Sequence, residues 1–310
     1  MNPMRCFRCD EKAAIRMRQH RLSLCKDHYI EWFVEQTDRA IRHQHMFTRR
    51  DRVLVAVSGG KDSLGLWDVL GKLGYQADGL YINLGIAGEE PYSAQSEEYA
   101  RAFAAERSLV LHVVNVKDTY GRDIPNLARR SRRGKEKPCS VCGLTKRHVM
   151  NRISHEMNYD VLATAHNLDD EVAVLMGNVM NWHTDLLGRQ SPVLDAADGF
   201  SRKVKPFFRF YERETAAYAL LRGIEYIEDE CPFSVGSKQL YYKDMLNRIE
   251  EEQPGTKLAF YIGFLNAREK GAFKELPDAA RDGELRDCPN CGQPTSNEGL
   301  CSFCRVVSNP

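Results

Sequence analysis

The chain has 310 residues, of which 44 are basic and 43 acidic, so its net charge is only +1. This length can bury a sizeable core and indicates one large domain with smaller modules attached. The sequence holds no apolar run of 18 residues and starts without the hydrophobic region of a signal peptide, which excludes a membrane protein and favours a soluble cytosolic one.

The chain begins with a group of potential metal ligands. Cys6 and Cys9 are followed by Cys25 and His28, each pair separated by two residues, which is the spacing of a tetrahedral zinc site built from two knuckles. The chain has ten cysteines in all. In a cytosolic protein such thiols stay reduced and are better explained as metal ligands than as disulfides. Residues 29–50 then show a helical pattern that links this finger to the main body.

The sequence VLVAVSGGKDS, residues 53–63, predicts a buried strand that runs into a glycine turn and then a helix. Gly59 and Gly60 let the backbone approach an anion, while free amide groups and Lys61 supply donors and positive charge. The turn therefore suits a phosphate or pyrophosphate. It is not a Walker A loop, because position 62 is an aspartate where that pattern needs serine or threonine.

The following pattern predicts parallel strands joined by helices, with ligands bound beyond the carboxyl ends of the strands. The expected strands and helices alternate as strands 53–57, 79–84 and 109–116 and helices 62–73 and 92–107. Further along, the sequence predicts a basic loop at 118–138, a helix at 140–157, a strand at 159–165, an irregular stretch at 183–205, a helix at 211–222, a strand EYI before Asp229 and a helical segment at 239–274. Two basic clusters, at 39–52 and 129–137, favour a nucleic-acid partner, although such clusters are often merely solvated faces.

Three cysteines remain outside any four-ligand set. Cys139 and Cys142 are two residues apart, and Cys231 lies far along the chain. Three thiolates leave one position open on a metal or cluster, which is useful in catalysis, or they perform thiol chemistry themselves. The remaining interpretation is three buried cysteines that only pack, which the neighbouring prolines disfavour.

The motif HNLDDE places Asp169, Asp170 and Glu171 at the end of a strand, where carboxylates can hold Mg²⁺ against phosphates or transfer protons. An N-cap role for Asp169 explains the motif equally well. Lys146 lies one turn after Cys142 on the predicted helix, so the two side chains can face one cavity.

The end of the chain repeats the zinc pattern with four thiolates, from Cys288, Cys291, Cys301 and Cys304. Residues 274–287 read as a polar linker to this finger. Segments this small are stabilised mainly by their metal. The predicted organisation is a zinc finger at 1–30, a linker helix at 31–50, a nucleotide-binding domain at 51–240, a helical segment and linker at 241–284 and a second finger at 285–310.

SGGKDS after a strand resembles the PP-loop of the ATP pyrophosphatase superfamily, whose members split ATP between the α- and β-phosphates. Together with PCSVCGLTKR (138–147), ATAHNLDDE (163–171), ECPF (230–233) and the two terminal ligand groups, the chain resembles the TtuA family of tRNA 2-thiouridine synthetases over essentially its whole length. The resemblance implies an α/β fold, with a parallel-sheet, adenine nucleotide α-hydrolase-like PP-loop domain flanked by two zinc fingers.

The resemblance also implies a reaction and its components. ATP, with Mg²⁺, adenylates the C2 oxygen of a tRNA uridine, pyrophosphate leaves, and sulfur then displaces AMP. Cys139, Cys142 and Cys231 match the ligands of a 4Fe-4S cluster that carries the sulfur, and the terminal groups match two Zn²⁺ sites. The positions that match the nucleotide site are Val57, Ser58, Gly59, Gly60, Lys61, Asp62, Ser63, Ile82 and Ala165, with Lys146 and Asp170 near the phosphates and the uridine.

Two other functions compete with this one: a zinc-stabilised RNA-binding module with a regulatory nucleotide site, and a thiolase that uses a cysteine persulfide in place of a cluster. The sequence leaves open which uridine is modified and whether Asp170 is a base or only orients. It also leaves the sulfur donor open, among a ubiquitin-like thiocarboxylate protein, a persulfide carrier and free sulfide. A homodimer is an expectation from the resembled family alone.

Overall fold

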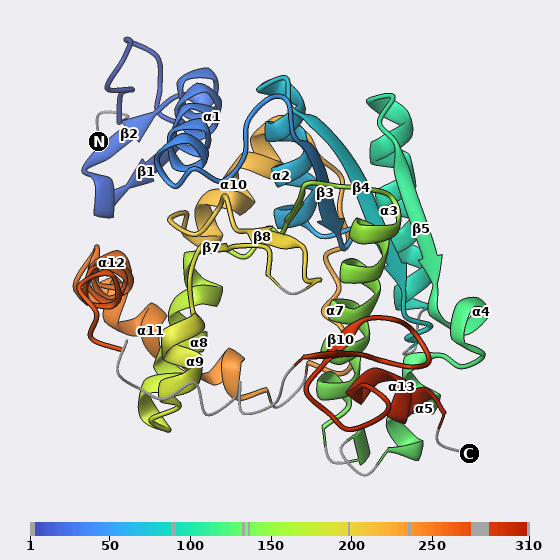
Figure 1. Ribbon diagram of the computed structural model, residues 1–310. Coiled ribbons are helices and arrows are strands. Elements are labelled where there is room, and N and C mark those ends of the chain that lie inside the picture. The colour runs from blue at the N-terminus through green and yellow to red at the C-terminus, as the bar shows by residue number, and fades with distance from the viewer. Residues whose placement is uncertain are drawn as a thin grey trace.

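The computed structural model describes residues 4–87, 91–131, 134–135, 137–197, 199–234, 237–273 and 285–308. Its central element is a six-stranded sheet in the order β5-β4-β3-β6-β8-β7 (Figure 1). Five strands are parallel and β7 pairs antiparallel with β8. Their bounds are β3 (Arg52–Val57), β4 (Gln76–Asn83), β5 (Leu111–Asn115), β6 (Val161–Ala163), β7 (Val193–Leu194) and β8 (Arg202–Val204). The predicted α/β fold with a mainly parallel sheet is confirmed.

Both faces of the sheet are covered, which explains why β3 is apolar at almost every position. Successive strand residues point to opposite faces. Val53 and Val55 belong to the main core, which also contains residues of α2 (Lys61–Lys72), whereas Leu54 packs in a second cluster with Val149 and Ile153 of α7 (Pro138–Glu156). The sheet is thus held between helices, with the carboxyl ends of its strands left for a ligand.

Close packing of α2 on the sheet depends on one glycine. The ring of Trp67 lies so near Gly79 of β4 that an added Cβ would come within 2.5 Å of it. The indole nitrogen of Trp67 also donates a 2.8 Å hydrogen bond to the carbonyl oxygen of Ala77. These two contacts therefore fix the distance between α2 and β4. They also fix the position of the glycine turn at residues 58–60, the phosphate-loop turn, which leads into α2.

The other helices surround this core. Helices α11 (Lys238–Glu252) and α12 (Thr256–Glu269) pack against α8 (Leu168–Met180), as Figure 1 shows, and α10 (Glu212–Arg222) packs against α2. The remaining helices of the described sheet domain are α3 (Tyr92–Glu106), α4 (Val116–Tyr120), α5 (Ile124–Arg130) and α9 (Thr184–Arg189).

Two small modules lie at opposite sides of the molecule (Figure 1). The N-terminal module contains the antiparallel pair β1 (Ile15–Met17) and β2 (Leu22–Leu24), joined by the short 3-10 helix η1 (Arg18–His20), and it leads into α1 (Lys26–His43). The C-terminal module contains β9 (Arg286–Asp287), β10 (Pro294–Thr295) and α13 (Ser302–Val307), which packs on α5 and α7. In the described residues no helix has both the length and the apolar character needed to span a bilayer.

Several local predictions were wrong. The basic loop at 118–138 contains α5, and the irregular stretch at 183–205 contributes two strands to the sheet. The EYI segment forms no strand, and it meets the phosphate loop by one hydrogen bond of 3.0 Å from the Ile227 amide to the Gly59 carbonyl. The helical segment at 239–274 is two helices, because Gly255 lies between them at φ +102°. Most of the predicted linker at 274–287 lies outside the described residues.

Candidate active site and metal centres

The glycine turn after β3 has the backbone of an anion-binding loop. Gly59 adopts φ +77°, a left-handed conformation that favours glycine, and an added side chain would collide with the backbone carbonyl of Ser96 on α3. Gly60 is the N-cap of α2 and has no side-chain cap. The first amides of the helix therefore remain available to a phosphate.

Two serines hold this turn in shape. The Ser58 amide donates to the Ser63 hydroxyl oxygen at 3.0 Å, and the two hydroxyl oxygens lie 3.1 Å apart. Ser63 in turn donates to the carbonyl oxygen of Gly60 at 3.0 Å. The loop is thus fixed by its own side chains before any ligand binds.

A cavity of about 330 Å³ opens beyond the carboxyl ends of β3, β4 and β6. It brings together residues from five separate parts of the chain. Eight residues that the sequence proposed for the nucleotide or the reaction line it: Val57, Ser58, Asp62, Ser63, Ile82, Lys146, Ala165 and Asp170. The remaining lining residues include Tyr81, Tyr92, Ser93, Ser96, Met150, Thr164 and His166. The size and the mixed apolar and polar lining suit a nucleotide.

Lys61 does not line this cavity. Its ammonium lies 3.0 Å from a carboxylate oxygen of Asp62 and 3.0 Å from one of Glu212 on α10. Glu212 also contacts Lys243 of α11 at 3.1 Å, and Lys243 lies 2.7 Å from Asp170. A chain of alternating charges therefore connects the phosphate loop with Asp170. These pairings raise the pKa of Lys61 and of Lys243, against the effect of burial.

Of the three adjacent carboxylates at the start of α8, only Asp170 faces the cavity. Asp169 is buried and pairs with Lys257 at 2.6 Å, and Glu171 is buried and pairs with Lys205 at 2.7 Å. The alternative of Asp169 as N-cap is wrong, because the cap is Asn167. Asn167 accepts from the Asp170 amide at 3.1 Å, and its own amide donates to the Asp170 carboxylate at 3.1 Å.

Among the lining residues outside the predicted set, His166 and Tyr92 bear most on the chemistry of the cavity. His166 lies inside the quoted HNLDDE motif, so attention to its imidazole would have found it. Desolvation lowers its pKa, as do Lys205 and Lys146, while Asp170 acts in the opposite direction. Tyr92, at the start of α3, had no motif to mark it.

The three cysteines outside the terminal groups come together. The Cys139 thiol donates to the carbonyl oxygen of Phe233 at 3.0 Å, which joins the first turn of α7 to the turn that follows Cys231. Burial raises the pKa of the Cys142 thiol, and the charges of Cys231 and Cys139 act in the same direction. At least two of the three sulfur atoms lie more than 4.8 Å apart. They are therefore spread more widely than the ligands of a single ion.

This cysteine trio, Cys139, Cys142 and Cys231, adjoins the cavity. Lys146 lines the cavity and lowers the pKa of Cys142. Tyr92 also lines it, and its pKa is raised by burial and then by the charges of Cys231 and Cys142. Cys142, Cys231 and Tyr92 pack against one apolar cluster that contains Leu84. The cysteine trio and the cavity thus share a wall.

The N-terminal ligand group forms a compact set. The ligand atoms of Cys6, Cys9, Cys25 and His28 all lie within 4.8 Å of one another. The Nδ1 atom of His28 is 3.2 Å from the sulfur of Cys25, and the Arg8 amide donates to the Cys6 sulfur at 3.4 Å. Three thiolates and one imidazole at this separation suit a tetrahedral metal ion, and the set has no open side for catalysis.

The C-terminal ligand group is equally compact. The sulfur atoms of Cys288, Cys291, Cys301 and Cys304 also lie within 4.8 Å of one another. Backbone amides donate to two of them, from Cys301 to the Cys288 sulfur at 3.3 Å and from Cys304 to the Cys301 sulfur at 3.4 Å. Such bonds stabilise thiolates. Both termini therefore carry metal-binding modules.

Comparison with known families gives two matches along the chain. A model of the PP-loop domain matches residues 33–236. A model of the N-terminal LIM domain of the 2-thiouridine synthetase TtuA matches residues 5–30.

Similar proteins carry related names. The tRNA-5-methyluridine(54) 2-sulfurtransferase of Thermus thermophilus is 51% identical over 303 residues, covering 98% of this chain and 91% of the relative. The protein of that name from Pyrococcus horikoshii is 40% identical, with 97% and 93% covered. Among solved structures, the U34-tRNA thiolase NcsA from Methanococcus maripaludis with its 4Fe-4S cluster matches with a TM-score of 0.79 at 24% identity. That match covers 100% of this chain and 97% of NcsA, and it shows the common fold.

Proposed function

The chain belongs to the TtuA family of PP-loop tRNA 2-thiouridine synthetases, and on that premise we propose that it replaces the C2 oxygen of 5-methyluridine 54 in tRNA by sulfur. ATP-dependent tRNA 2-thiolation is the activity of the family. Position 54 is favoured because the relatives at 51% and 40% identity bear that substrate in their names, whereas NcsA, named for U34, is 24% identical.

The reaction needs two steps because the C2 oxygen of uridine is a poor leaving group. In the first, this oxygen attacks the α-phosphorus of ATP, the bond to the β-phosphate oxygen breaks and pyrophosphate departs. In the second, a sulfur nucleophile attacks C2 and AMP leaves with the former uridine oxygen. Charge that develops on pyrophosphate and AMP must be stabilised by fixed donors.

In this proposal the phosphates bind at the phosphate-loop turn and the adenine binds among apolar residues of the cavity. The amides of the first turn of α2 offer donors without reorganisation, because Ser58 and Ser63 already fix the loop. Lys146 adds positive charge from across the cavity. Lys61 would join only after leaving Glu212 or Asp62, since both carboxylates hold it in this structure.

Asp170 is the proposed group at the uridine. One of its carboxylate oxygens accepts from the Asn167 amide at the start of α8, and the other is paired with Lys243. These contacts fix the orientation of the side chain. A fixed carboxylate at this place can bind Mg²⁺ or orient the uridine. His166, whose pKa is lowered, is a neutral partner for a proton there.

The cysteine trio fits a 4Fe-4S cluster better than a single ion, because its sulfur atoms lie outside the 4.8 Å separation of the two terminal sets and supply only three ligands. When bound, such a cluster offers an iron without a protein ligand that can hold a sulfur atom. The chain's own contribution is position: Lys146 and Tyr92 belong both to the cavity wall and to the surroundings of the trio. This shared wall is the observation that carries the proposal, because it brings sulfur to the activated carbon.

Further components follow from the chemistry of the ligands. The two terminal sets are proposed Zn²⁺ sites, since closed groups of thiolate and imidazole ligands suit that ion. An external sulfur donor is required, because each turnover consumes one sulfur atom, and a ubiquitin-like thiocarboxylate protein is the first candidate. None of the ten cysteines, all of which are described, forms a disulfide, and this fits a reducing, cytoplasmic compartment.

Anaerobic turnover with two tRNA substrates tests the proposal. We expect ATP-dependent formation of AMP and pyrophosphate with tRNA that carries 5-methyluridine at position 54, and 2-thiolation of that nucleoside by mass spectrometry. A tRNA with position 54 replaced by cytidine, but with U34 intact, is the matched control and should give neither product. Thiolation at U34 instead would overturn the choice of position. Thiolation by protein that lacks iron-sulfur absorbance would mean that a cysteine persulfide, and not a cluster, carries the sulfur.

A further inference from the structure

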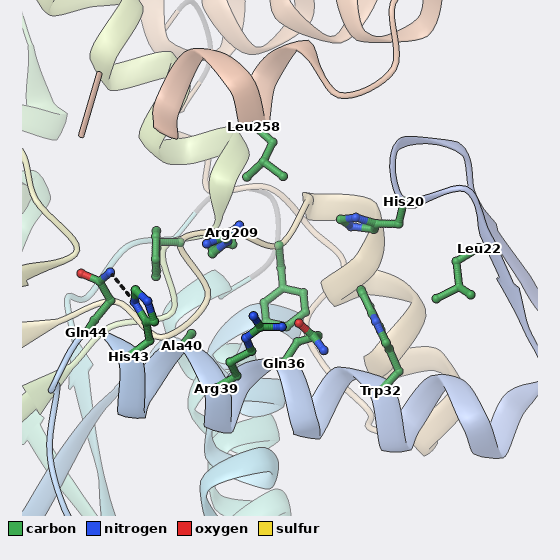
Figure 2. Close-up of a pocket in the computed structure, with 12 residues that line it drawn as sticks. His20, Leu22, Trp32, Gln36, Arg39, Ala40, His43, Gln44, Arg209 and Leu258 are labelled. Carbon is green, nitrogen blue, oxygen red and sulfur yellow. Dashed lines mark hydrogen bonds between the residues drawn. The ribbon is translucent and has the colours of Figure 1, made fainter. Parts of the chain in front are cut away.

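A second cavity, of about 360 Å³, lies where α1 meets the turn around residues 208–210. It shares no lining residue with the reaction cavity. Figure 2 shows that its walls come from α1, from the η1–β2 part of the N-terminal module, from the turn of the sheet domain and from α12. The lining residues are His20, Leu22, Trp32, Gln36, Arg39, Ala40, His43, Gln44, Phe208, Arg209, Phe210 and Leu258. None of them is acidic.

Two arginines, Arg39 and Arg209, line this cavity. Arg39 rises from α1 toward Arg209 in Figure 2. In the described part of the chain, neither guanidinium has an ion-pair or hydrogen-bond partner, whereas Arg42 on the same helix pairs with Asp38 at 2.8 Å. Burial lowers the pKa of Arg209, and the charge of Arg39 acts in the same direction. The pair is therefore a concentration of unneutralised positive charge.

The surrounding polar groups are able to donate. Gln36 and His43 lie on the same face of α1 as Arg39, and Gln44 follows at the end of that helix, with its amide nitrogen 3.5 Å from Nδ1 of His43. The carboxylate of Glu214 contacts the lining through His20, at 3.0 Å, and it is fully buried. Glu214 also accepts a hydrogen bond from the Tyr211 amide at 3.0 Å, so its carboxylate already has partners of its own.

We propose that this cavity binds a backbone phosphate of tRNA at a distance from the reacting uridine. Two guanidinium forks facing one space match the paired oxygens of a phosphodiester, and the amide and imidazole donors complete the set. Because the walls come from four parts of the chain, a bound phosphate would also hold the N-terminal module against the sheet domain. The inference rests on the enzyme's action on tRNA, and it holds whichever uridine is thiolated.

The test measures tRNA affinity of the metal-loaded enzyme over a range of salt concentrations. Arg39→Gln and Arg209→Gln should each weaken binding about fivefold to tenfold and reduce the slope of log affinity against log salt by about 1. The rate of AMP formation at saturating tRNA should stay within about twofold. Arg42→Gln is the matched control, because Arg42 is on the same helix and already has a carboxylate partner. Equal weakening by Arg42→Gln would show that a general basic surface, and not the cavity, binds the tRNA, and would overturn the proposal. Unchanged affinity in both cavity variants would also overturn it.

A second measurement uses the unmodified sequence, so it does not depend on variants that fold. Phenylglyoxal modifies accessible arginines, and peptide mass spectrometry then reports the rate at each one. Bound tRNA should slow modification of Arg39 and Arg209 at least fivefold relative to Arg42, while millimolar inorganic phosphate should not. Protection by inorganic phosphate without protection by tRNA would make this a small-anion site and overturn the assignment to RNA.

Discussion

The thiol of Cys139 donates a 3.0 Å hydrogen bond to the carbonyl oxygen of Phe233. This contact joins two segments 94 residues apart and sets the turn after Cys231 against the first turn of α7. The carbonyl of Cys231 accepts from both the amide and the hydroxyl of Ser234, at 2.8 and 2.7 Å, which shapes that turn. The three cysteines are therefore brought together by the protein chain itself.

Substitution Cys231→Ser separates the two chemical steps. Adenylation uses the cavity and should persist, whereas sulfur insertion should fall below detection because the trio loses one soft ligand. We expect AMP formation within about threefold of the unaltered enzyme, no thiouridine, and loss of the iron-sulfur absorbance. Loss of AMP formation together with thiolation, in a variant with an unchanged melting temperature, would contradict separate roles for cavity and trio.

Substitution Gly59→Ala should abolish ATP binding at the phosphate-loop turn. An alanine at φ +77° costs about 1–2 kcal/mol, and its methyl group would meet the Ser96 carbonyl, so the turn must shift. We expect ATP affinity by calorimetry to fall at least tenfold. Gly71→Ala, in α2 with nothing within 4 Å of the new methyl group, is the control. It should leave ATP affinity unchanged and raise stability by about 0.5–1 kcal/mol.

Two substitutions at Asp170 distinguish its charge from its structural contacts. Asn keeps an oxygen that can accept from the Asn167 amide, whereas Ala removes the capping box and should cost about 1 kcal/mol more. If the charge acts in the reaction, both variants lower kcat for AMP formation by about 100-fold or more, while thermal melting separates them. Full activity in Asp170→Asn would reduce the role of Asp170 to helix capping.

The C-terminal module should loosen as the pH falls from about 6.5 to 4. Burial, together with Arg152, lowers the pKa of His148 to about 4, and its ring stacks on Phe303 with centroids 3.8 Å apart. Because the folded pKa is below the unfolded value, the stabilisation is complete above pH 6.5 and is lost as pH falls through the folded pKa. The loss is at most about 3 kcal/mol.

Denaturant unfolding of His148→Phe across this pH range provides the measurement. Phenylalanine keeps a flat ring against Phe303 but cannot take a proton. Protonation of the metal ligands changes the stability of both proteins equally. The difference between their two curves of unfolding free energy against pH therefore reports on His148 alone. Parallel curves would contradict the prediction.

Metal analysis should give two equivalents of zinc per chain that are independent of the cysteine trio. Cys288→Ser should lose one equivalent and destabilise the packing of Phe303 on Tyr120, whose ring centroids lie 4.8 Å apart. Cys231→Ser should retain both. A loss of zinc in Cys231→Ser would place a zinc ion at the trio and contradict the ligand assignment.

Much of the site was predictable because its residues are adjacent in sequence. The phosphate-loop turn, the two terminal ligand sets and the pair Cys139 and Cys142 are local patterns, and a local pattern fixes backbone geometry and ligand spacing wherever the chain folds. The alternation of apolar segments likewise predicted the parallel sheet, since strands covered on both faces must be apolar throughout. The strands β7 and β8 escaped detection because their two or three residues, in SPVLDA and SRKVKP, belong to no longer apolar run, whereas the three residues of β6 lie within YDVLATA.

The order of residues thus establishes which chemical groups the protein has and what they can bind. Which of these groups lie together depends on the packing of the folded chain. This packing selected Asp170 over Asp169 and Glu171 for the cavity by pairing those two with Lys257 and Lys205, and it held Lys61 away from the cavity through Glu212. It also placed Cys231 beside α7. Contacts between distant segments depend on how whole elements pack, and no spacing along the chain records that.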